Sequence, residues 1–419
     1  MSRTSLRVPG DKSVSHRALM LAVLGRGSSR VRGLLRSADV ASTAGVLRAL
    51  GATIPDLATD ELVIEGRGLR GLVAANVPLD CGNSGTTARL MAGVIAGAGI
   101  TARFEGDASL SARPMRRVAA PLTAMGAAVE LPVHGGLPMT VQGAPLHGLT
   151  WRTEVASAQV KSAILLAGLV GDVPVEVHEP SATRDHTERM LRARGVDVRN
   201  EGNVISLLPA ARLDAGDIDV PGDPSSAAFF AGVAALGVSD EIAISNVGIN
   251  PGRVGAFRAL LRMGASLRYE QVSEQGGEPV ASIVVGAGAL RGTRITGDEV
   301  PSLIDELPLL ACVAARAGGE TRVTGAGELR VKESDRIRAI VANLLAVGAD
   351  AEELPDGFVV QGSERPLRGT VVTHGDHRIA MAFAILGAVS GNAISIDDPS
   401  CVAVSYPTFW DDLARVRRR

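Results

Sequence analysis

The sequence predicts an α/β protein of two lobes, each with helices inside a layer of sheets, which is an inside-out α/β barrel. The first observation is a pattern of a polar cluster, an apolar stretch rich in Ala and Leu, a glycine and an alternating stretch. The second is an amphipathic helix pattern that interleaves with the first. The third is Val-Pro-Gly-Asp, which stands at residues 8–11 and again at 220–223. The six copies of the first pattern span residues 13–33, 85–106, 160–180, 225–247, 306–326 and 377–398.

Each repeat is expected to form strand, helix, strand, helix, strand, strand, written βαβαββ. The first helix is apolar nearly all round, so it is expected to be buried, whereas the second has a polar face. A glycine follows each Leu-rich second helix, which is typical of a helix C-cap, and the alternation after it predicts a strand. These helix ends lie at residues 47–54, 122–130, 191–198, 261–269 and 344–354.

The six repeats divide most simply into three plus three, and the two Val-Pro-Gly-Asp segments stand three repeats apart. Proline fixes φ and glycine permits unusual φ values, so this pair suits a sharp crossover between lobes. We therefore expect one lobe at residues 11–220 and the other at residues 1–10 plus 221–419, with crossovers near Pro9-Gly10 and Pro221-Gly222. The alternative is a pair of unrelated tight turns.

Composition bounds the class of protein. The chain has 419 residues, of which 46% are hydrophobic and 21% charged, and these values suit large buried cores. Aromatic residues make up 3% and the net charge is −2, which argues against a nucleic-acid-binding surface. Cys81, Cys312 and Cys401 fit neither a disulfide framework nor a zinc site. No signal peptide or membrane-spanning run is recognised, so a cytoplasmic protein is expected.

Lysine is rare in a chain that uses arginine almost everywhere. Lysine and arginine together number 43, yet only Lys12, Lys161 and Lys332 are lysines. Either these three survive by chance, or a compact ammonium group whose pKa burial can shift is needed there. For Lys161 two roles stay open: it neutralises anions in a site, or it pairs with a carboxylate as part of the structure.

Polar clusters precede the buried helices. In these clusters Asp223, Ser225 and Asp376 are interpreted as ordinary N-caps. Capping does not explain the cations, because the dipole disfavours positive charge in the first turn of a helix. A bound anion would reverse that cost, so the clusters predict a substrate that carries several negative charges. The four cations placed in this way are Lys12, Arg17, Arg89 and Arg378.

Further charged residues lie in loops. Taken alone, residues 329–340 are interpreted as a solvated helix face. Beside anion-binding cations, however, Glu333 is a carboxylate able to exchange a proton with a substrate. His377 is interpreted as structural, or as a residue that supports the site without touching the substrate. The loop cations are Arg113, Arg184, Lys332 and Arg336.

Seven motifs resemble those of the 3-phosphoshikimate 1-carboxyvinyltransferase (EPSP synthase) family, in its order and over essentially the whole chain. They are PGDKSVSHRAL, LDCGNSGTTARL, ARPMRR, SAQVKSAILLAGL, RDHTERML, LRVKESDRI and GDHRIAMAF. The resemblance implies two lobes of three βαβαββ units that close on substrate. It also implies transfer of the enolpyruvyl group of phosphoenolpyruvate to the 5-hydroxyl of shikimate 3-phosphate, on the route to chorismate and aromatic amino acids. A monomer without metal or other cofactor, and without nucleic-acid or membrane partners, is expected.

The resemblance also implies residue roles. Asp305 is similar to the base on the 5-hydroxyl, Glu333 to the acid that protonates the methylene carbon, and catalytic Lys12 reaches both substrates. The implied shikimate 3-phosphate site comprises Lys12, Ser13, Arg17, Ser157, Ala158, Gln159, Arg184, Asp305 and Lys332. The implied phosphoenolpyruvate site comprises Lys12, Asn83, Gly85, Arg113, Gln159, Arg336 and Arg378.

Two positions bear on how closely the family pattern is followed. Val404 stands where some members have a lysine shortly before an aromatic-proline pair, so one phosphoenolpyruvate contact of those members is missing here. Gly85 is the small residue of the pattern that is sensitive to glyphosate, which predicts competitive inhibition by that compound.

Three other functions agree less well with the sequence. A transferase acting on UDP-N-acetylglucosamine typically has a reactive cysteine near Arg113, but residues 106–117 contain none. An RNA 3′-phosphate cyclase would need a nucleotidylated histidine, which no motif supports. A non-catalytic anion-binding protein would have no need of both Asp305 and Glu333, and both are present.

Overall fold

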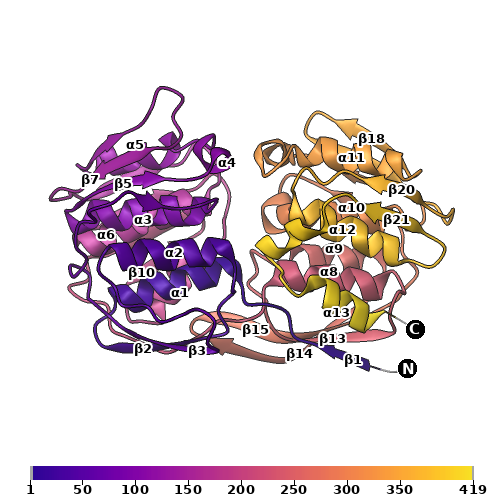
Figure 1. The fold of residues 1–419 in the computed structure, drawn as a ribbon, viewed down its shortest axis with the longest axis horizontal. Helices are drawn as coiled ribbons and strands as arrows, with labels where there is room; N and C mark the ends of the chain where they lie inside the picture. The colour runs from indigo at the N-terminus through magenta and orange to yellow at the C-terminus, as the bar shows by residue number, and fades with distance from the viewer. Residues whose placement is uncertain (1–2, 418–419) are drawn as a thin grey trace. The chain divides into compact units, whose positions relative to one another are not determined.

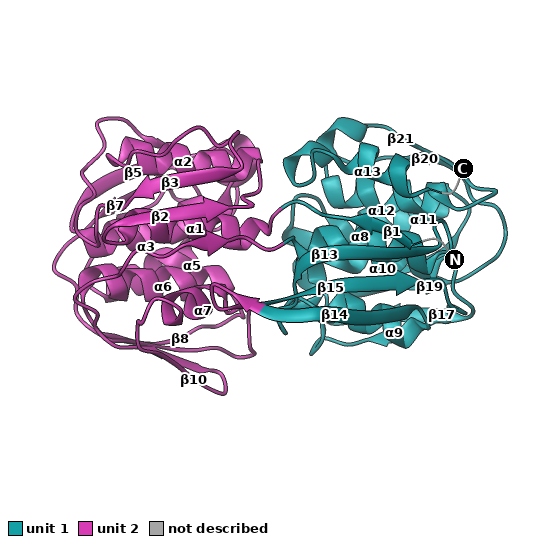
Figure 2. Ribbon diagram, turned by 90° about the horizontal axis from the view of Figure 1, so that it is seen from below, with its two compact units in different colours: residues 1–9, 222–273, 279–419 teal, residues 10–221, 274–278 magenta. Residues whose placement is uncertain are grey.

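A computed structural model describes residues 3–417; residues 1–2 and 418–419 lie outside the described part. The chain forms two compact units (Figure 2). Of the described residues, unit 1 holds 3–9, 222–273 and 279–417, and unit 2 holds 10–221 and 274–278.

The six predicted apolar helices are all present and almost wholly buried, as expected from their composition. Figure 1 shows them stacked inside their units. Unit 2 contains α1 (Lys12–Leu24), α3 (Gly85–Ala98) and α6 (Ala158–Gly171). Unit 1 contains α8 (Pro224–Ala235), α10 (Leu307–Ala314) and α12 (His377–Ala388).

The amphipathic second helices also form, and their glycine ends are confirmed. The five predicted end glycines all have positive φ, the conformation that glycine adopts without strain: Gly51, Gly126, Gly195, Gly264 and Gly348. The helices are α2 (Ala38–Ala49), α5 (Arg116–Ala124), α7 (His186–Arg192), α9 (Gly255–Met263), α11 (Arg336–Ala346) and α13 (Phe409–Val416). A short helix, α4 (Ala108–Ser111), precedes α5.

Four sheets have the complete βαβαββ arrangement. In each, the first two strands are parallel, and the fourth strand of the repeat lies between the second and the third. Unit 2 has β4 (Leu79–Asp80), β5 (Thr101–Glu105), β7 (Met139–Gln142) and β6 (Ala128–Glu130), then β8 (Leu149–Arg152), β9 (Val175–His178), β11 (Val204–Leu207) and β10 (Val198–Glu201). Unit 1 has β1 (Arg3–Leu6), β13 (Glu241–Gly248), β15 (Glu278–Gly286) and β14 (Ser266–Gln275), then β16 (Arg294–Ile295), β17 (Glu320–Val323), β19 (Gly357–Gln361) and β18 (Asp350–Leu354).

The first and last repeats are shorter than predicted. The first sheet has three strands, β12 (Ile218–Asp219), β2 (Ser28–Arg32) and β3 (Glu61–Glu65), and residues 51–60 form no strand. Pro55 in that segment cannot donate to a strand ladder, which explains part of the difference. The last sheet pairs only β20 (Arg368–Val371) with β21 (Ala393–Ile396), and the chain continues through the 3-10 helix η4 (Pro399–Val404) to α13.

The two Val-Pro-Gly-Asp turns are structurally equivalent rather than unrelated. β1 precedes the first turn but pairs with β13 of unit 1, and β12 precedes the second turn but pairs with β2 of unit 2. Each turn therefore leads from a strand of one unit into a buried helix of the other. The amide of Asp11 donates to the carbonyl of Pro221 (2.7 Å), and the amide of Asp223 donates to that of Pro9 (2.9 Å). A Cβ on Gly10 would lie 2.0 Å from a backbone oxygen, so only glycine fits.

The predicted second lobe includes residues 274–278, but these group with unit 2. They form the tip of the β14–β15 hairpin. Gly277 approaches the carbonyl of Arg189 so closely that a Cβ would lie 2.6 Å from that oxygen. Glu278 contacts His186 of α7 through its carboxylate, with 2.7 Å between Oε1 and Nδ1. These contacts attach the tip to unit 2, and no local pattern in the hairpin indicated them.

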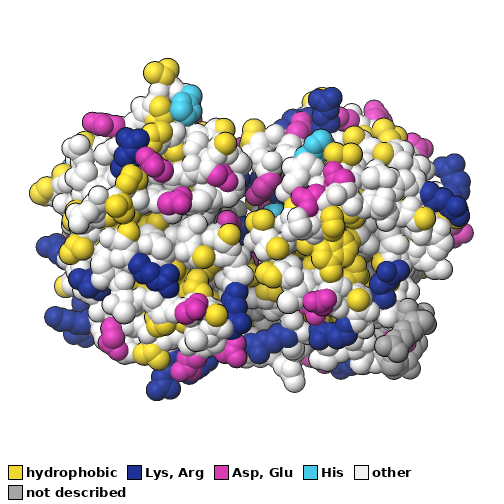
Figure 3. All heavy atoms as spheres, viewed as in Figure 1, with side chains coloured by type: hydrophobic (Ala, Val, Ile, Leu, Met, Phe, Trp, Pro, Cys, Tyr) yellow, Lys and Arg dark blue, Asp and Glu magenta, His cyan; other side chains and the backbone are white. Residues whose placement is uncertain are grey.

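Charges of both signs are interspersed on the face drawn in Figure 3, in agreement with a net charge of −2. Among the described residues, charges of opposite sign pair between strands of one sheet, as Arg32 does with Glu61 and Arg268 with Glu241. Within residues 3–417, the structure has no helix of the length and apolarity that crossing a membrane requires.

Candidate active site

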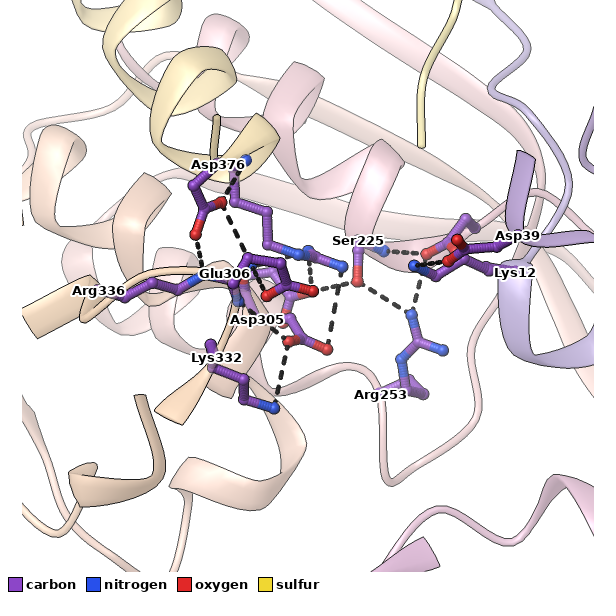
Figure 4. A network of polar contacts seen from close by, with 12 residues as sticks. Lys12, Asp39, Ser225, Arg253, Asp305, Glu306, Lys332, Arg336 and Asp376 are labelled. Atoms are coloured by element: carbon purple, nitrogen blue, oxygen red, sulfur yellow. Dashed lines mark hydrogen bonds and ion pairs between the residues drawn. The ribbon is translucent and has the colours of Figure 1, made fainter. Parts of the chain in front are cut away.

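In unit 1, Asp305 is surrounded by cations. It lies on the 3-10 turn η2 (Ile304–Glu306), directly before the buried helix α10. Its Oδ1 is 3.5 Å from Arg336 Nη1 and 3.9 Å from Lys332 Nζ, and its Oδ2 is 3.9 Å from Arg378 Nη2 (Figure 4). The arrangement favours an ionised carboxylate, the form that accepts a proton.

Arg336 is the centre of this cluster. It is the first residue of α11, and its side chain is 1% exposed. Its Nε donates to Asp376 Oδ2 (2.8 Å) and its Nη2 to Glu333 Oε2 (2.7 Å). Burial alone would lower the pKa of Arg336, but Glu333 and Asp376 raise it above its ordinary value. The two predicted proton-transfer residues, Asp305 and Glu333, therefore pair with the same cation, the guanidinium of Arg336.

The interpretation of residues 329–340 as a solvated helix face is wrong for Lys332, Glu333 and Arg336. Lys332 and Glu333 follow the 3-10 helix η3 (Gly327–Val331) and precede α11, so they lie on a loop. Asp335 caps α11 by accepting from the amide of Arg338. Ser-Asp in front of an apolar periodic run is an N-terminal signal that would have placed the helix start correctly.

A second buried group in unit 1 was missed by sequence reasoning. The hydroxyl of Ser225 donates to Glu306 Oε1, and Arg253 Nη2 donates to Ser225 Oγ (3.0 Å) and to Asp223 Oδ1 (2.9 Å) (Figure 4). Burial and the neighbouring Asp305 raise the pKa of Glu306. This group connects the second crossover turn to the residue beside Asp305.

The N-cap predictions for α8 and α12 are partly confirmed. Asp223 caps α8 by accepting from the amide of Ser225 (2.7 Å), and Asp376 caps α12 by accepting from that of Arg378 (3.0 Å). Ser225 is not a cap, because Pro224 already occupies the first helical position. His377, the first residue of α12, is buried.

In unit 2, Arg17 is fixed by hydroxyl groups. It donates from Nε to Thr187 Oγ1 (2.7 Å), from Nη2 to Ser162 Oγ (2.8 Å) and from Nη1 to the carbonyl of Ser13 (2.9 Å). Burial lowers its pKa to about 10, and Arg184 is among the charges that act on it. Its position thus depends on three buried helices, which no local pattern indicated.

Lys12 opens α1, and its Nζ lies 3.1 Å from Oδ2 of Asp39 on α2. Asp39 was not singled out in the sequence, where it stands in the first turn of an ordinary amphipathic helix. Lys12 and Arg378 do lie in a first turn, as predicted. The same prediction is wrong for Arg17 and Arg89, which lie one turn further along their helices.

Two hydrogen-bonded chains surround the start of α3. Arg113 Nη2 donates to Asn83 Oδ1 (2.7 Å), and Asn83 Nδ2 donates to Asp107 Oδ2 (2.6 Å). Arg89 Nη1 donates to Gln159 Oε1 (2.7 Å), which joins α3 to α6. Burial, together with the neighbouring Arg113, lowers the pKa of Arg89 to about 10.

The other predicted residues take these places. Gly85 is the first residue of α3, and a Cβ there would lie 2.5 Å from Arg89 Nη1. Ser157 caps α6 by accepting from the amide of Val160 (3.4 Å), and Ala158 follows it. Val404 ends η4 and is 38% exposed.

Lys161 pairs with carboxylates, which decides between its two open roles in favour of the structural pairing. Its Nζ lies 2.8 Å from Glu179 Oε2 and 2.8 Å from Glu188 Oε1. Burial alone would lower its pKa, but Glu188 and Glu179 raise it. The lysine is therefore a buried cation.

The repeated βαβαββ fold is that of the enolpyruvyl transferases. The enolpyruvyl transferase NikO from Streptomyces tendae matches with a TM-score of 0.77 over 99% of this chain and 94% of that chain, at 17% identity, which shows the fold alone. EPSP synthase from Acinetobacter baumannii matches with a TM-score of 0.91 and 42% identity over 99% of this chain and 96% of that one.

Sequence comparison gives the family. The model of EPSP synthase (3-phosphoshikimate 1-carboxyvinyltransferase) matches residues 3–413. The 3-phosphoshikimate 1-carboxyvinyltransferase of Sulfurihydrogenibium sp. (strain YO3AOP1) is 46% identical over 99% of this chain and 97% of its own length. That of Alkalilimnicola ehrlichii is 48% identical over 97% and 92%. The chain belongs to the EPSP synthase family, and it is a transferase of that class.

Proposed function

We propose that the chain transfers the enolpyruvyl group of phosphoenolpyruvate to the 5-hydroxyl of shikimate 3-phosphate and releases phosphate. This places it in the shikimate pathway, which leads to chorismate and the aromatic amino acids. Family membership supports the reaction. The observation that carries the residue assignment is the pairing of Asp305 and Glu333 with one buried arginine, Arg336.

The shikimate 3-phosphate ligands come mainly from unit 2. Lys12 contacts the phosphate from the first residue of α1, where backbone amides also favour an anion, and Arg17 contacts it from the next turn of the same helix. Ser13, Ser157, Ala158 and Gln159 lie at the starts of α1 and α6 and bind the same substrate, with Arg184 in support. The resemblance to the family assigns Asp305 and Lys332 to the same substrate.

For phosphoenolpyruvate we assign Asn83, Gly85, Arg113, Gln159, Arg336 and Arg378, as the resemblance to the family implies. Lys12 contacts both substrates. The arginines offer forked donors that match phosphate and carboxylate groups. The hydrogen bonds that now hold Arg113 and Arg336 are those that the substrate joins or replaces.

The chemistry divides between two carboxyl groups. In its protonated form, Glu333 gives a proton to the methylene carbon, which makes the adjoining carbon electrophilic, while ionised Asp305 takes the proton of the attacking 5-hydroxyl. In the elimination that follows, a methyl proton returns to Glu333 and the C–O bond to phosphate breaks. The proton taken by Asp305 leaves with the phosphate, whose charge the arginines stabilise.

The enzyme acts as a monomer in the cytoplasm. Its cysteines support a reducing compartment, because Cys81, Cys312 and Cys401 are all free thiols and two of them are buried in the cores.

The experiment is phosphate release with both substrates and with each omitted in turn. Release that requires both, and that falls by about 10²–10⁴ in Asp305→Asn and Glu333→Gln, supports the assignment. Glu364→Gln, an exposed position in unit 1, is the matched control. Shikimate 3-phosphate binding without phosphate release would favour a non-catalytic binding protein instead.

A further inference from the structure

Lys161 occupies a buried charged group to which the proposed function gives no role. Its two partners, Glu179 and Glu188, lie at the end of β9 and in the first turn of α7. All three side chains are at most 1% exposed. A charge left without its counterion is most costly in such a place, so the pairing of Lys161 determines where the two carboxylates point.

The group lies next to the arginine that we assign to the substrate phosphate. Two contacts between neighbouring residues join α6 to α7: Ser162 accepts a hydrogen bond from Thr187 (2.8 Å), and Lys161 pairs with Glu188. Arg17 donates to both hydroxyls of the first contact. Burial lowers the pKa of Arg17, and Glu188 is the first of the charges that act against this effect. Glu188 is therefore close enough to Arg17 for their charges to interact.

Charge balance shows what Lys161 prevents. Arg17, Lys161, Glu179 and Glu188 together are neutral. Without Lys161 the other three carry a net negative charge, and Arg17 is their cation. A carboxylate and a phosphate bind a guanidinium through the same forked donors, so Glu188 would then compete with the ligand for Arg17.

We propose that Lys161 is a positioning residue for phosphate binding. It holds Glu188 so that the guanidinium of Arg17 stays available to a phosphate monoester. The inference rests on the proposed function, in which Arg17 contacts the phosphate of shikimate 3-phosphate.

The test compares full-length wild type with Lys161→Met, Glu188→Gln and the double variant. Calorimetry measures the affinity of each for shikimate 3-phosphate and for shikimate, which lacks the phosphate. Lys161→Met is expected to weaken binding of the phosphate ester by at least about tenfold and of shikimate by less than about threefold. Adding Glu188→Gln is expected to restore affinity for the ester to within about threefold of wild type.

Arg194→Met is the control, because Arg194 is a cation of intermediate burial in the same unit, two residues after the end of α7. It is expected to change stability without changing affinity for either ligand. The inference is overturned if Lys161→Met binds the ester as tightly as wild type does. It is also overturned if Lys161→Met weakens binding of shikimate as much as binding of the ester, or if Glu188→Gln does not restore affinity for the ester in the double variant.

Should Lys161→Met fail to fold, Glu188→Gln alone decides. Binding of the ester at least as tight as in wild type supports the inference, and weaker binding refutes it. A wild-type chain that binds no shikimate 3-phosphate would refute the proposed function itself, which separates the two failures.

Discussion

The two units share a repeat but bury different polar groups at the starts of their helices. In unit 2 a chain of short contacts joins His16 Nδ1 to Thr43, Thr43 to Thr87, and Thr87 to Ser84, at 2.6, 2.6 and 2.7 Å. In unit 1 the corresponding groups are carboxylates and arginines: Asp223, Arg253, Glu306, Arg336 and Asp376.

This difference indicates that the same repeat can carry groups that orient their neighbours in one unit and groups that transfer protons in the other. Hydroxyl groups and a neutral imidazole orient their neighbours without changing charge near neutral pH. Burial lowers the pKa of His16 to about 3, so it stays neutral. Carboxylates near arginines can exchange protons and stabilise charge that develops. The hydroxyl chain of unit 2 is therefore suited to orienting neighbouring side chains, and the carboxylates of unit 1 are suited to proton transfer.

The largest effect is expected from a substitution that breaks the buried charged cluster of unit 1. Arg336→Met would leave the fully buried Asp376 without its guanidinium, at a cost of about 3–5 kcal/mol in the free energy of unfolding. Urea denaturation would measure it. Arg322→Met is the matched control in unit 1, because its pair with Glu320 is about 39% exposed on both sides. It should cost less than about 1 kcal/mol. Equal losses of unfolding free energy in Arg336→Met and Arg322→Met would show that the buried cluster contributes no more to stability than an exposed ion pair.

The sequence predicted the fold well because the fold repeats. One turn sequence, six apolar helices and five end glycines agree with one another, so each supports the others. The departures are local. The missing strand at residues 51–60 and the placement of residues 274–278 depend on proline and on tertiary contacts that have no period.

The site was predictable where a residue is unusual for its place. Lys12 and Arg378 stand against a helix dipole, and that conflict was visible in the sequence. Asp39, Glu306 and Arg253 were missed because carboxylates and arginines are ordinary on helices and loops. Their partners lie 27 or more positions away in the chain, as with Lys12 and Asp39 or Ser225 and Glu306, so folding alone brings them together.

The neutral histidine should make unit 2 sensitive to acid. The unfolded chain binds a proton at His16 below pH 6.5, but the folded chain does so only near pH 3. Stability should therefore fall as pH drops through this window, by about 1.4 kcal/mol per pH unit. His16→Gln should lose about 2 kcal/mol less than wild type between pH 7 and pH 5, measured by urea denaturation. The exposed His134→Gln should keep the wild-type slope. Parallel slopes for wild type and His16→Gln would contradict the assignment.

A Gly85→Ala substitution tests whether the space beside Arg89 at the start of α3 matters for phosphoenolpyruvate binding. A Cβ there would lie 2.5 Å from Arg89 Nη1, so Ala must displace that guanidinium and its bond to Gln159. Loss of a charged hydrogen bond predicts a KM for phosphoenolpyruvate about tenfold higher, with weaker glyphosate inhibition. Steady-state kinetics would measure both. Gly45→Ala, which meets nothing within 4 Å, should leave both unchanged. Unaltered glyphosate sensitivity in Gly85→Ala would count against this contact.

Glu306 gives unit 1 the opposite response to pH from that of His16. Burial and Asp305 raise its pKa in the folded chain above the ordinary 4.5. The unfolded chain therefore loses this proton first as pH rises, and stability falls from pH 4.5 up to the folded pKa. Glu306→Gln keeps an acceptor for Ser225 but cannot ionise. The urea midpoint of this variant, relative to that of wild type, should therefore rise as pH increases from 4.5 to 7. The exposed Glu364→Gln should show no gain. If the urea midpoint of Glu306→Gln instead falls relative to wild type as pH rises, the Glu306 carboxylate is ionised and paired in the folded chain. The contrast in pH response between the units would then depend on His16 alone.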